Sequence, residues 1–175
     1  IDCSSTSQYF YKDQDGLLHA GPVWDYDWAY GVERIQEEID YMDPTGFSAR
    51  DIPGSLIWWQ LLYYNNAFYQ DVVSLYESVL YPWLNELVET GLTQWAQELS
   101  ASAVMDYLRW GRVSVGGEAS ASSTATLMEA AGQAYMDQVE QVRSFLSARK
   151  EFLYSEWAGW ILFLLPNCLP PDKPR

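Results

Sequence analysis

The chain has 175 residues, 49% of them hydrophobic, and includes nine tryptophans and thirteen tyrosines. This composition is typical of one packed globular domain and excludes a disordered chain. Its 24 acidic residues outnumber 10 basic ones and give a formal charge of −14. Because a surface of this sign repels phosphate groups, the charge argues against nucleic acid and anionic membranes as partners.

The first eight residues are mostly small and polar around Asp2, and they predict a loop. Since the chain begins at Ile1 without a signal-like opening, we expect it to be cut from a longer protein. Cys3 and Cys168 lie near opposite ends of the chain. The sequence leaves open whether they form a disulfide or remain two separate thiols.

Residues 9–24 predict a β-hairpin. The apolar runs 9–11 and 17–24 flank a short polar segment that carries an Asp-Gly turn signal. Because a hairpin folds the chain back, we expect the carboxylates of Asp2 and Asp25, on either side of it, to lie within about 10 Å. His19 is a single histidine inside the second strand, and no catalytic role is expected for it.

An acidic and aromatic block follows at residues 20–32, where Asp25 and Asp27 alternate with tryptophan and tyrosine. In an extended backbone, side chains two residues apart point to the same side. Two carboxylates converging beside apolar rings repel each other and lose hydration, so they call for a cation, and magnesium or manganese is expected. The alternative interpretation is an ordinary Asp-rich surface loop that ends at Gly31.

The remainder of the chain predicts helices. Residues 32–43 are expected to form one or two helical turns, ended by the turn signal of residues 43–46. From Ile52 onward, apolar residues recur every three or four positions, as in a helical bundle. Asn65 and Asn66 predict a corner, Pro82 an interruption, and Gly91 the end of a helix.

A further helix is expected from Thr93 to Trp110, then a flexible loop at residues 116–126 and a long final helix. The fold class predicted is therefore α+β, mainly α, with a small β-hairpin followed by a helical bundle. The residues expected to form the apolar stripes of the bundle are Leu56, Ile57, Leu61, Leu62, Phe68, Val72, Leu75, Val79, Leu80, Trp83, Leu84, Leu87, Val88, Leu99, Val104, Tyr107, Leu108, Tyr135, Val139, Val142, Leu146 and Leu153.

Several of these segments together resemble the CotH kinase family, named for a spore-coat protein. The likeness rests on Asp2, on residues 7–13 (SQYFYKD), on residues 21–31 (GPVWDYDWAYG) and, more softly, on helical segments such as residues 145–153 (FLSARKEFL). It covers residues 1–158 and implies the C-terminal lobe of a protein-kinase-like fold. Residues 159–175 are expected to be an apolar and Pro-rich tail, too short to span a membrane.

The resemblance implies an atypical kinase that transfers the γ-phosphate of ATP to seryl residues, with Mg²⁺ or Mn²⁺. It assigns Asp2 as the catalytic acid and Asp25 and Asp27 as metal-binding groups. Ser7 stands where a typical kinase has a metal-binding asparagine, and Gln8 could substitute for it, so both are candidate cofactor-binding residues. The expected substrate is a protein with a Ser-rich segment, at an extracellular, cell-surface or spore-coat location.

The sequence contains no Gly-rich phosphate loop and no lysine in the strand motif that holds ATP phosphates. We therefore expect an N-terminal lobe of the same protein as a partner, and little turnover from this segment alone. One alternative is a non-catalytic, pseudokinase-like interaction module of the same fold. A second alternative is a carbohydrate-active helical protein. Its weakness is that glycosidase acids normally lie about 5 Å or more apart across the sugar, and two acids only two residues apart are poorly placed to flank a bond from both sides.

Overall fold

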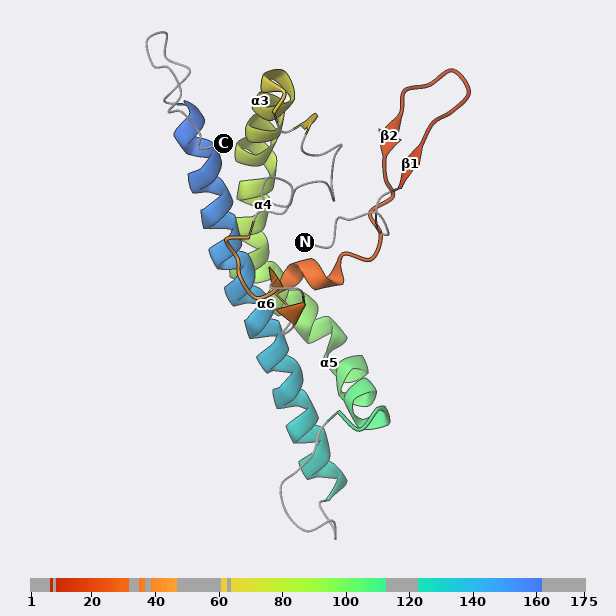
Figure 1. Cartoon of the computed structure of the whole chain (residues 1–175). Coiled ribbons are helices and arrows are strands. Elements are labelled where there is room, and N and C mark those ends of the chain that lie inside the picture. Colours follow the sequence, from red (N-terminus) through yellow and green to blue (C-terminus); the bar gives the residue numbers. More distant parts are fainter. Residues whose placement is uncertain are drawn as a thin grey trace.

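The computed structural model describes residues 7, 9–31, 35–36, 39–46, 61–62, 64–112 and 123–161, and the structural statements below concern these residues. They form two small antiparallel sheets and a set of helices dominated by two long helical columns (Figure 1). The predicted mainly helical α+β class is confirmed. None of the helices within these ranges is long and apolar enough to cross a membrane.

The predicted hairpin is present, although its ladder is short. Strand β1 (Phe10–Tyr11) pairs with β2 (His19–Ala20), with Phe10 opposite Ala20 and Tyr11 opposite His19. The Tyr11 and His19 rings stack with centroids 4.9 Å apart. Pairing ends where Gly21, at φ 139°, donates its amide to the Tyr9 carbonyl (2.8 Å). Figure 1 shows the hairpin projecting away from the helices.

Residues 35–36 and 39–40 form a second pair of antiparallel strands, the second hairpin, where helical turns were predicted. Strand β3 (Ile35–Gln36) pairs with β4 (Ile39–Asp40), with Ile35 opposite Asp40 and Gln36 opposite Ile39. The helical prediction was therefore wrong for these residues, since the β-branched isoleucines stand in a strand ladder. The predicted turn at residues 43–46 is confirmed: the Asp43 Oδ1 accepts from the Thr45 amide (2.8 Å) and hydroxyl (2.7 Å).

The first helical column runs without a break from α3 to α5. It consists of α3 (Asn66–Leu75), the π-helical turn η2 (Tyr76–Leu80), α4 (Tyr81–Glu86), a second π-helical turn η3 (Leu87–Gly91) and α5 (Leu92–Arg109). The predicted corner is confirmed, because the Asn65 side chain caps α3 by accepting from the Phe68 amide (3.1 Å).

Two predicted helix ends inside this column were wrong. Pro82 lies in the first turn of α4, immediately after the wider η2 turn, so the column continues through it. Gly91 has a right-handed helical backbone (φ −60°, ψ −44°) instead of the left-handed conformation of a helix end, and α5 begins at Leu92, one residue before the predicted Thr93.

The second column is α6 (Thr124–Ile161), a single helix of 38 residues, about 57 Å long, antiparallel to the first (Figure 1). Its first residues, 124–126, fall in the predicted flexible loop, and its last three, 159–161, fall in the predicted tail. Ser123, just before the helix, caps it by accepting from the Thr126 amide (3.2 Å), and residues 116–122 and 162–175 lie outside the described residues. The predicted stripe of α6 is confirmed, because all five of its members are buried or half-buried: Tyr135, Val139, Val142, Leu146 and Leu153.

Two clusters form the core between the columns. The first surrounds Trp157 with Tyr69, Val73 and Tyr76, and the second packs Leu87 against Phe145 and Leu146. The stripe predicted for α3 and η2 is confirmed at Phe68 and Val72, which are half-buried, but was out of phase beyond them. Its members Leu75, Val79 and Leu80 are exposed, as is Trp83 of α4, because tyrosine rings packed on Trp157 take the buried face.

Farther along, Leu84, Leu87, Val88, Val104, Tyr107 and Leu108 are buried or half-buried as predicted, whereas Leu99 is exposed. Leu61 and Leu62 are also exposed. Leu56 and Ile57 lie outside the described residues.

Tyr76 fastens the two columns together, and its ionisation provides a test. Its hydroxyl donates to the Lys150 carbonyl (2.7 Å), its ring meets Trp157 edge-on at 4.5 Å, and only 2% of it is exposed. Burial, helped by the neighbouring Tyr81 and Glu151, raises the pKa of Tyr76 to about 12. The unfolded chain releases this proton near pH 10.

We therefore expect the stability contributed by Tyr76 to be complete below pH 10 and to be lost as the pH rises to 12, because only the unfolded state ionises readily there. Tyr76→Phe should lower stability at pH 7 by about 1 kcal/mol through the lost hydrogen bond. In this variant the melting temperature, measured by circular dichroism, should also fall less steeply between pH 10 and 12 than in the wild type. Tyr11→Phe, on the exposed hairpin, is the control, and equal slopes in all three proteins would contradict the assignment.

Candidate functional site

The acidic block lies between the first hairpin and α6. After the cis Gly21–Pro22 bond, Asp25 has a left-handed backbone (φ 59°), and the short 3₁₀ helix η1 (Asp27–Tyr30) follows at once. The extended backbone expected here was therefore wrong. An aspartate at positive φ is uncommon and is tolerated because its short polar side chain can bond locally.

Both carboxylates of the block are open to solvent. Asp25 and Asp27 are exposed, and neither forms an ion pair within the described part of the chain. Their oxygens are thus accessible to a ligand, as a metal-binding role requires. That both point to one place was argued from an extended backbone, so the convergence of the pair stays a prediction.

The end of η1 is fixed on α6 by a close backbone approach. Gly31 ends the 3₁₀ helix at φ 77° and ψ 53° and is buried. A Cβ built on it would lie 2.6 Å from Cγ and Cδ2 of Phe145, so only glycine fits both the conformation and the space. The Gln141 Nε2 also donates to the Gly31 carbonyl (2.7 Å), which satisfies this buried backbone acceptor.

The turn after β4 is held on the same helix. Arg149 Nη1 donates to the carbonyls of Pro44 (2.7 Å) and Gly46 (2.6 Å), and burial lowers the pKa of this guanidinium. Hydrogen bonds from Thr45 lower the pKa of Asp43 in the same turn, with a smaller contribution from Arg149. One positive side chain therefore anchors a whole turn to α6.

Aromatic contacts join the block to its surroundings. The Trp28 ring meets Tyr41 edge-on at 5.7 Å, linking η1 to the turn after β4. Trp24 meets Tyr9 edge-on at 6.4 Å, linking the block to the start of the hairpin. The two ends of the acidic block are thus tied to different neighbours, so Asp25 and Asp27 lie between two packed anchors.

The other predicted site residues are only partly described. Ser7 is buried, with 3% of its surface exposed. Asp2 and Gln8 lie outside the described residues, as do Cys3 and Cys168, so the gathering of Asp2 with Asp25 stays a prediction. Within the described ranges, no three acidic, histidine or cysteine side chains form a ready-made metal site.

The donor chemistry of the block nevertheless fits a hard divalent cation. Mg²⁺ is usually held by one or two carboxylates, with substrate phosphates and water completing its shell. Asp25 and Asp27 provide two exposed carboxylates of this kind. They would hold such an ion together with phosphate oxygens of a nucleotide.

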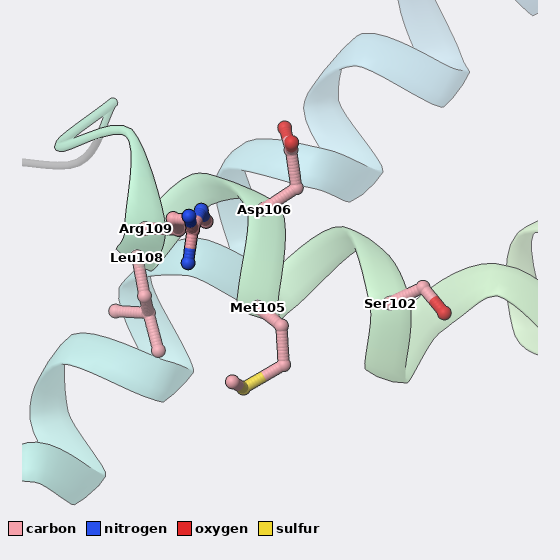
Figure 2. Close-up of a pocket in the computed structure, with 5 residues that line it drawn as sticks. All are labelled: Ser102, Met105, Asp106, Leu108 and Arg109. Carbon is pink, nitrogen blue, oxygen red and sulfur yellow. The ribbon is translucent and has the colours of Figure 1, made fainter.

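A separate hollow lies on α5, far from the acidic block. It is lined by Ser102, Met105, Asp106, Leu108 and Arg109 (Figure 2). Figure 2 shows Met105 and Leu108 on one side of the helix and Asp106 on the other. The Asp106 carboxylate lies 3.6 Å from Arg112, so the acid here already has a partner, and no acid pair faces this hollow.

Sequence reasoning missed the residues that hold the block in place. Gln141 and Gly31 meet across 110 positions, a contact that no local pattern reveals. The apolar stripe predicted this helix, but for Phe145 and Arg149 the signal was the softer family likeness of residues 145–153.

Comparison with known proteins settles the family. A family model described as CotH kinase protein matches residues 1–153. This chain belongs to the CotH kinase family. No curated protein and no solved structure matches the chain, so its likeness to the C-terminal lobe of other protein kinases stays a prediction. The family match spans the hairpin, the acidic block and most of α6, so it includes every contact described above except those of Trp157.

Gly31→Ala tests how tightly the block is seated on α6. The substitution adds a Cβ at positive φ and drives it into Phe145, so we expect a loss of about 2–4 kcal/mol in the free energy of unfolding, measured by urea denaturation. Gly111→Ala separates the two causes, because Gly111 has φ 60° but no atom within 4 Å of a built Cβ. It should lose only about 1 kcal/mol.

The second control is Gly132→Ala in the interior of α6, where a built Cβ would lie an ordinary 3.8 Å from Val104. It should be neutral or stabilising, by up to about 1 kcal/mol. A Gly31→Ala protein no less stable than the Gly111→Ala protein would show that the approach to Phe145 is not close.

Proposed function

We propose that this chain is the phosphoryl-transferring half of an atypical protein kinase that acts on seryl residues, with ATP and Mg²⁺ or Mn²⁺. The support is that the family match includes residues 21–31, and that the structure fixes this segment on α6 with its two carboxylates exposed. An exposed acid pair on a rigid support is what binding a metal–nucleotide complex requires.

In this proposal Asp25 and Asp27 are the metal-binding groups. A bound cation would neutralise charge on the phosphates of ATP. Asp25 and Asp27 would supply carboxylate oxygens for it, and the seating of Gly31 on α6 limits how far the backbone after them can move. Fixed ligands favour transfer because positioning and charge stabilisation are most of what catalyses this reaction.

Asp2 is proposed as the acid that receives the proton of the seryl hydroxyl. The new bond forms between the seryl oxygen and the γ-phosphorus, and the bond to the β–γ bridging oxygen breaks, leaving ADP. Asp2 precedes the hairpin and Asp25 follows it, and because a hairpin folds the chain back, we expect these two acids to lie close together. Ser7 and Gln8 are proposed to contribute to nucleotide binding beside them.

The whole protein is proposed to carry an N-terminal lobe that grips ATP, and to act on a Ser-rich protein outside the cell, at the cell surface or in a spore coat. The segment described here is expected to be inactive alone. A non-catalytic interaction module is the second candidate, and the burial of Ser7 favours it, because a hydroxyl with 3% exposure is poorly placed to replace an asparagine amide at a metal.

Transfer of labelled phosphate from ATP by the full-length protein tests this function. With Mn²⁺ and a Ser-rich protein substrate, the wild type should label seryl residues, and Asp25→Asn should reduce the rate about 100-fold or more, because a charged metal ligand is lost. Asparagine tolerates positive φ, so the backbone at residue 25 should be preserved.

Asp15→Asn is the matched control, since it removes the same charge from the exposed turn of the hairpin and should leave the rate unchanged. Undiminished transfer by Asp25→Asn would overturn the metal-binding role of Asp25. A full-length wild type that binds its protein partner but transfers no phosphate would favour the interaction module.

A further inference from the structure

Three side chains spaced four apart on α6 hold both connections that follow the first hairpin. Gln141 and Phe145 contact Gly31 at the end of η1, and Arg149 binds the carbonyls of Pro44 and Gly46. Residues four apart lie on the same face of a helix, one above the other. One face of α6 therefore supports the acidic block and the turn after β4 together.

Gln141 is the member of this row that joins the two connections. Its Nε2 donates to the Gly31 carbonyl (2.7 Å) and also contacts the Met42 sulfur (3.3 Å). Gly31 and Met42 belong to segments separated by the whole second hairpin. A single amide group thus sets the position of one segment relative to the other.

Only one short helical turn of backbone separates the Gly31 carbonyl from the proposed metal ligands. Gly31 directly ends η1, and η1 begins at Asp27. A single 3₁₀ turn, with the Ala29 amide bonded to the Tyr26 carbonyl (3.0 Å), connects the two. A turn this short has little conformational freedom. A displacement of Gly31 should therefore also displace Asp27 and, two residues before it, Asp25.

We propose that Gln141 is a positioning residue that sets the metal affinity of the acidic block through its hydrogen bond to the end of η1. The proposal rests on the proposed metal-binding role of Asp25 and Asp27. A neutral amide suits this place, because it donates to a backbone carbonyl without adding charge near two carboxylates. Removing a group that orients the metal ligands without contacting the metal typically lowers metal affinity or activity by about 10- to 100-fold.

Gln141→Glu in the full-length protein is the primary test, because an ionised glutamate keeps the shape of glutamine but cannot donate. Amide hydrogen exchange, followed by mass spectrometry, should be about fivefold faster in peptides covering residues 21–31, the factor expected for one lost hydrogen bond. Exchange in the interior of α6 should be unchanged. Gln141→Met, which removes the donor without adding charge, should behave in the same way.

Gln133→Glu is the matched control. Gln133 lies two turns earlier on α6, is exposed, and donates only to Asp137 of the same helix (2.8 Å). The same chemical change there should leave exchange of residues 21–31 at the wild-type rate. Equal exchange of these residues in the Gln141 variants and the wild type would overturn the positioning role.

Metal binding separates this proposal from the proposed function. The Kd for Mn²⁺, titrated in the presence of a non-hydrolysable ATP analogue, should rise about 10-fold in both Gln141 variants and stay unchanged in Gln133→Glu. At saturating Mn²⁺ the kcat should return to nearly the wild-type value, because the catalytic groups remain.

Faster exchange in the variants with an unchanged Kd for Mn²⁺ would overturn the link between Gln141 and the metal. A wild type that binds Mn²⁺ in this way, with the predicted loss in the variants but without any phosphate transfer, would contradict the kinase function and leave the positioning role standing.

Discussion

The contact of Gly31 with Phe145 is the constraint on which the arrangement of the acidic block depends. The backbone approaches the ring so closely that a Cβ would overlap it, and the Gln141 amide satisfies the carbonyl that this approach buries. The four residues of η1 form only one turn, so its position depends on this contact and on the Trp28 ring against Tyr41. The position of the two exposed aspartates thus depends on contacts made by other residues of the chain.

The support is α6, and the remaining packing keeps α6 in place. The first helical column contacts it through the cluster around Trp157 near one end and through Leu87, Phe145 and Leu146 near its middle. Phe145 belongs both to this core and to the contact with Gly31. Because one ring serves both, the stability of the helical columns and the position of the acidic block are coupled, and Tyr76 strengthens the same support by bonding to the Lys150 carbonyl.

Much of this fold follows from local patterns, and the rest depends on contacts distant in sequence. The Asp-Gly turn, the Asn65 cap and the regular stripe of α6 each carry a local signal, and each was predicted. The stripe of α3 and η2 was misplaced from Leu75 to Leu80 because tyrosine rings packed on Trp157 occupy the buried face. Pro82 and Gly91 were read as breaks because π-helical turns, which accommodate them, have no simple pattern. At the site, the acids were found from their spacing and family likeness, whereas Gln141 meets Gly31 only after folding.

The most direct test of the account is a crystal structure of the full-length protein with Mn²⁺ and a non-hydrolysable ATP analogue, with anomalous scattering used to locate the metal. The account predicts an Mn²⁺ peak about 2.1 Å from a carboxylate oxygen of Asp25, with Gly31 packed on Phe145 and bonded to Gln141. A metal bound to the nucleotide elsewhere, with Asp25 and Asp27 facing solvent and η1 detached from α6, would contradict it.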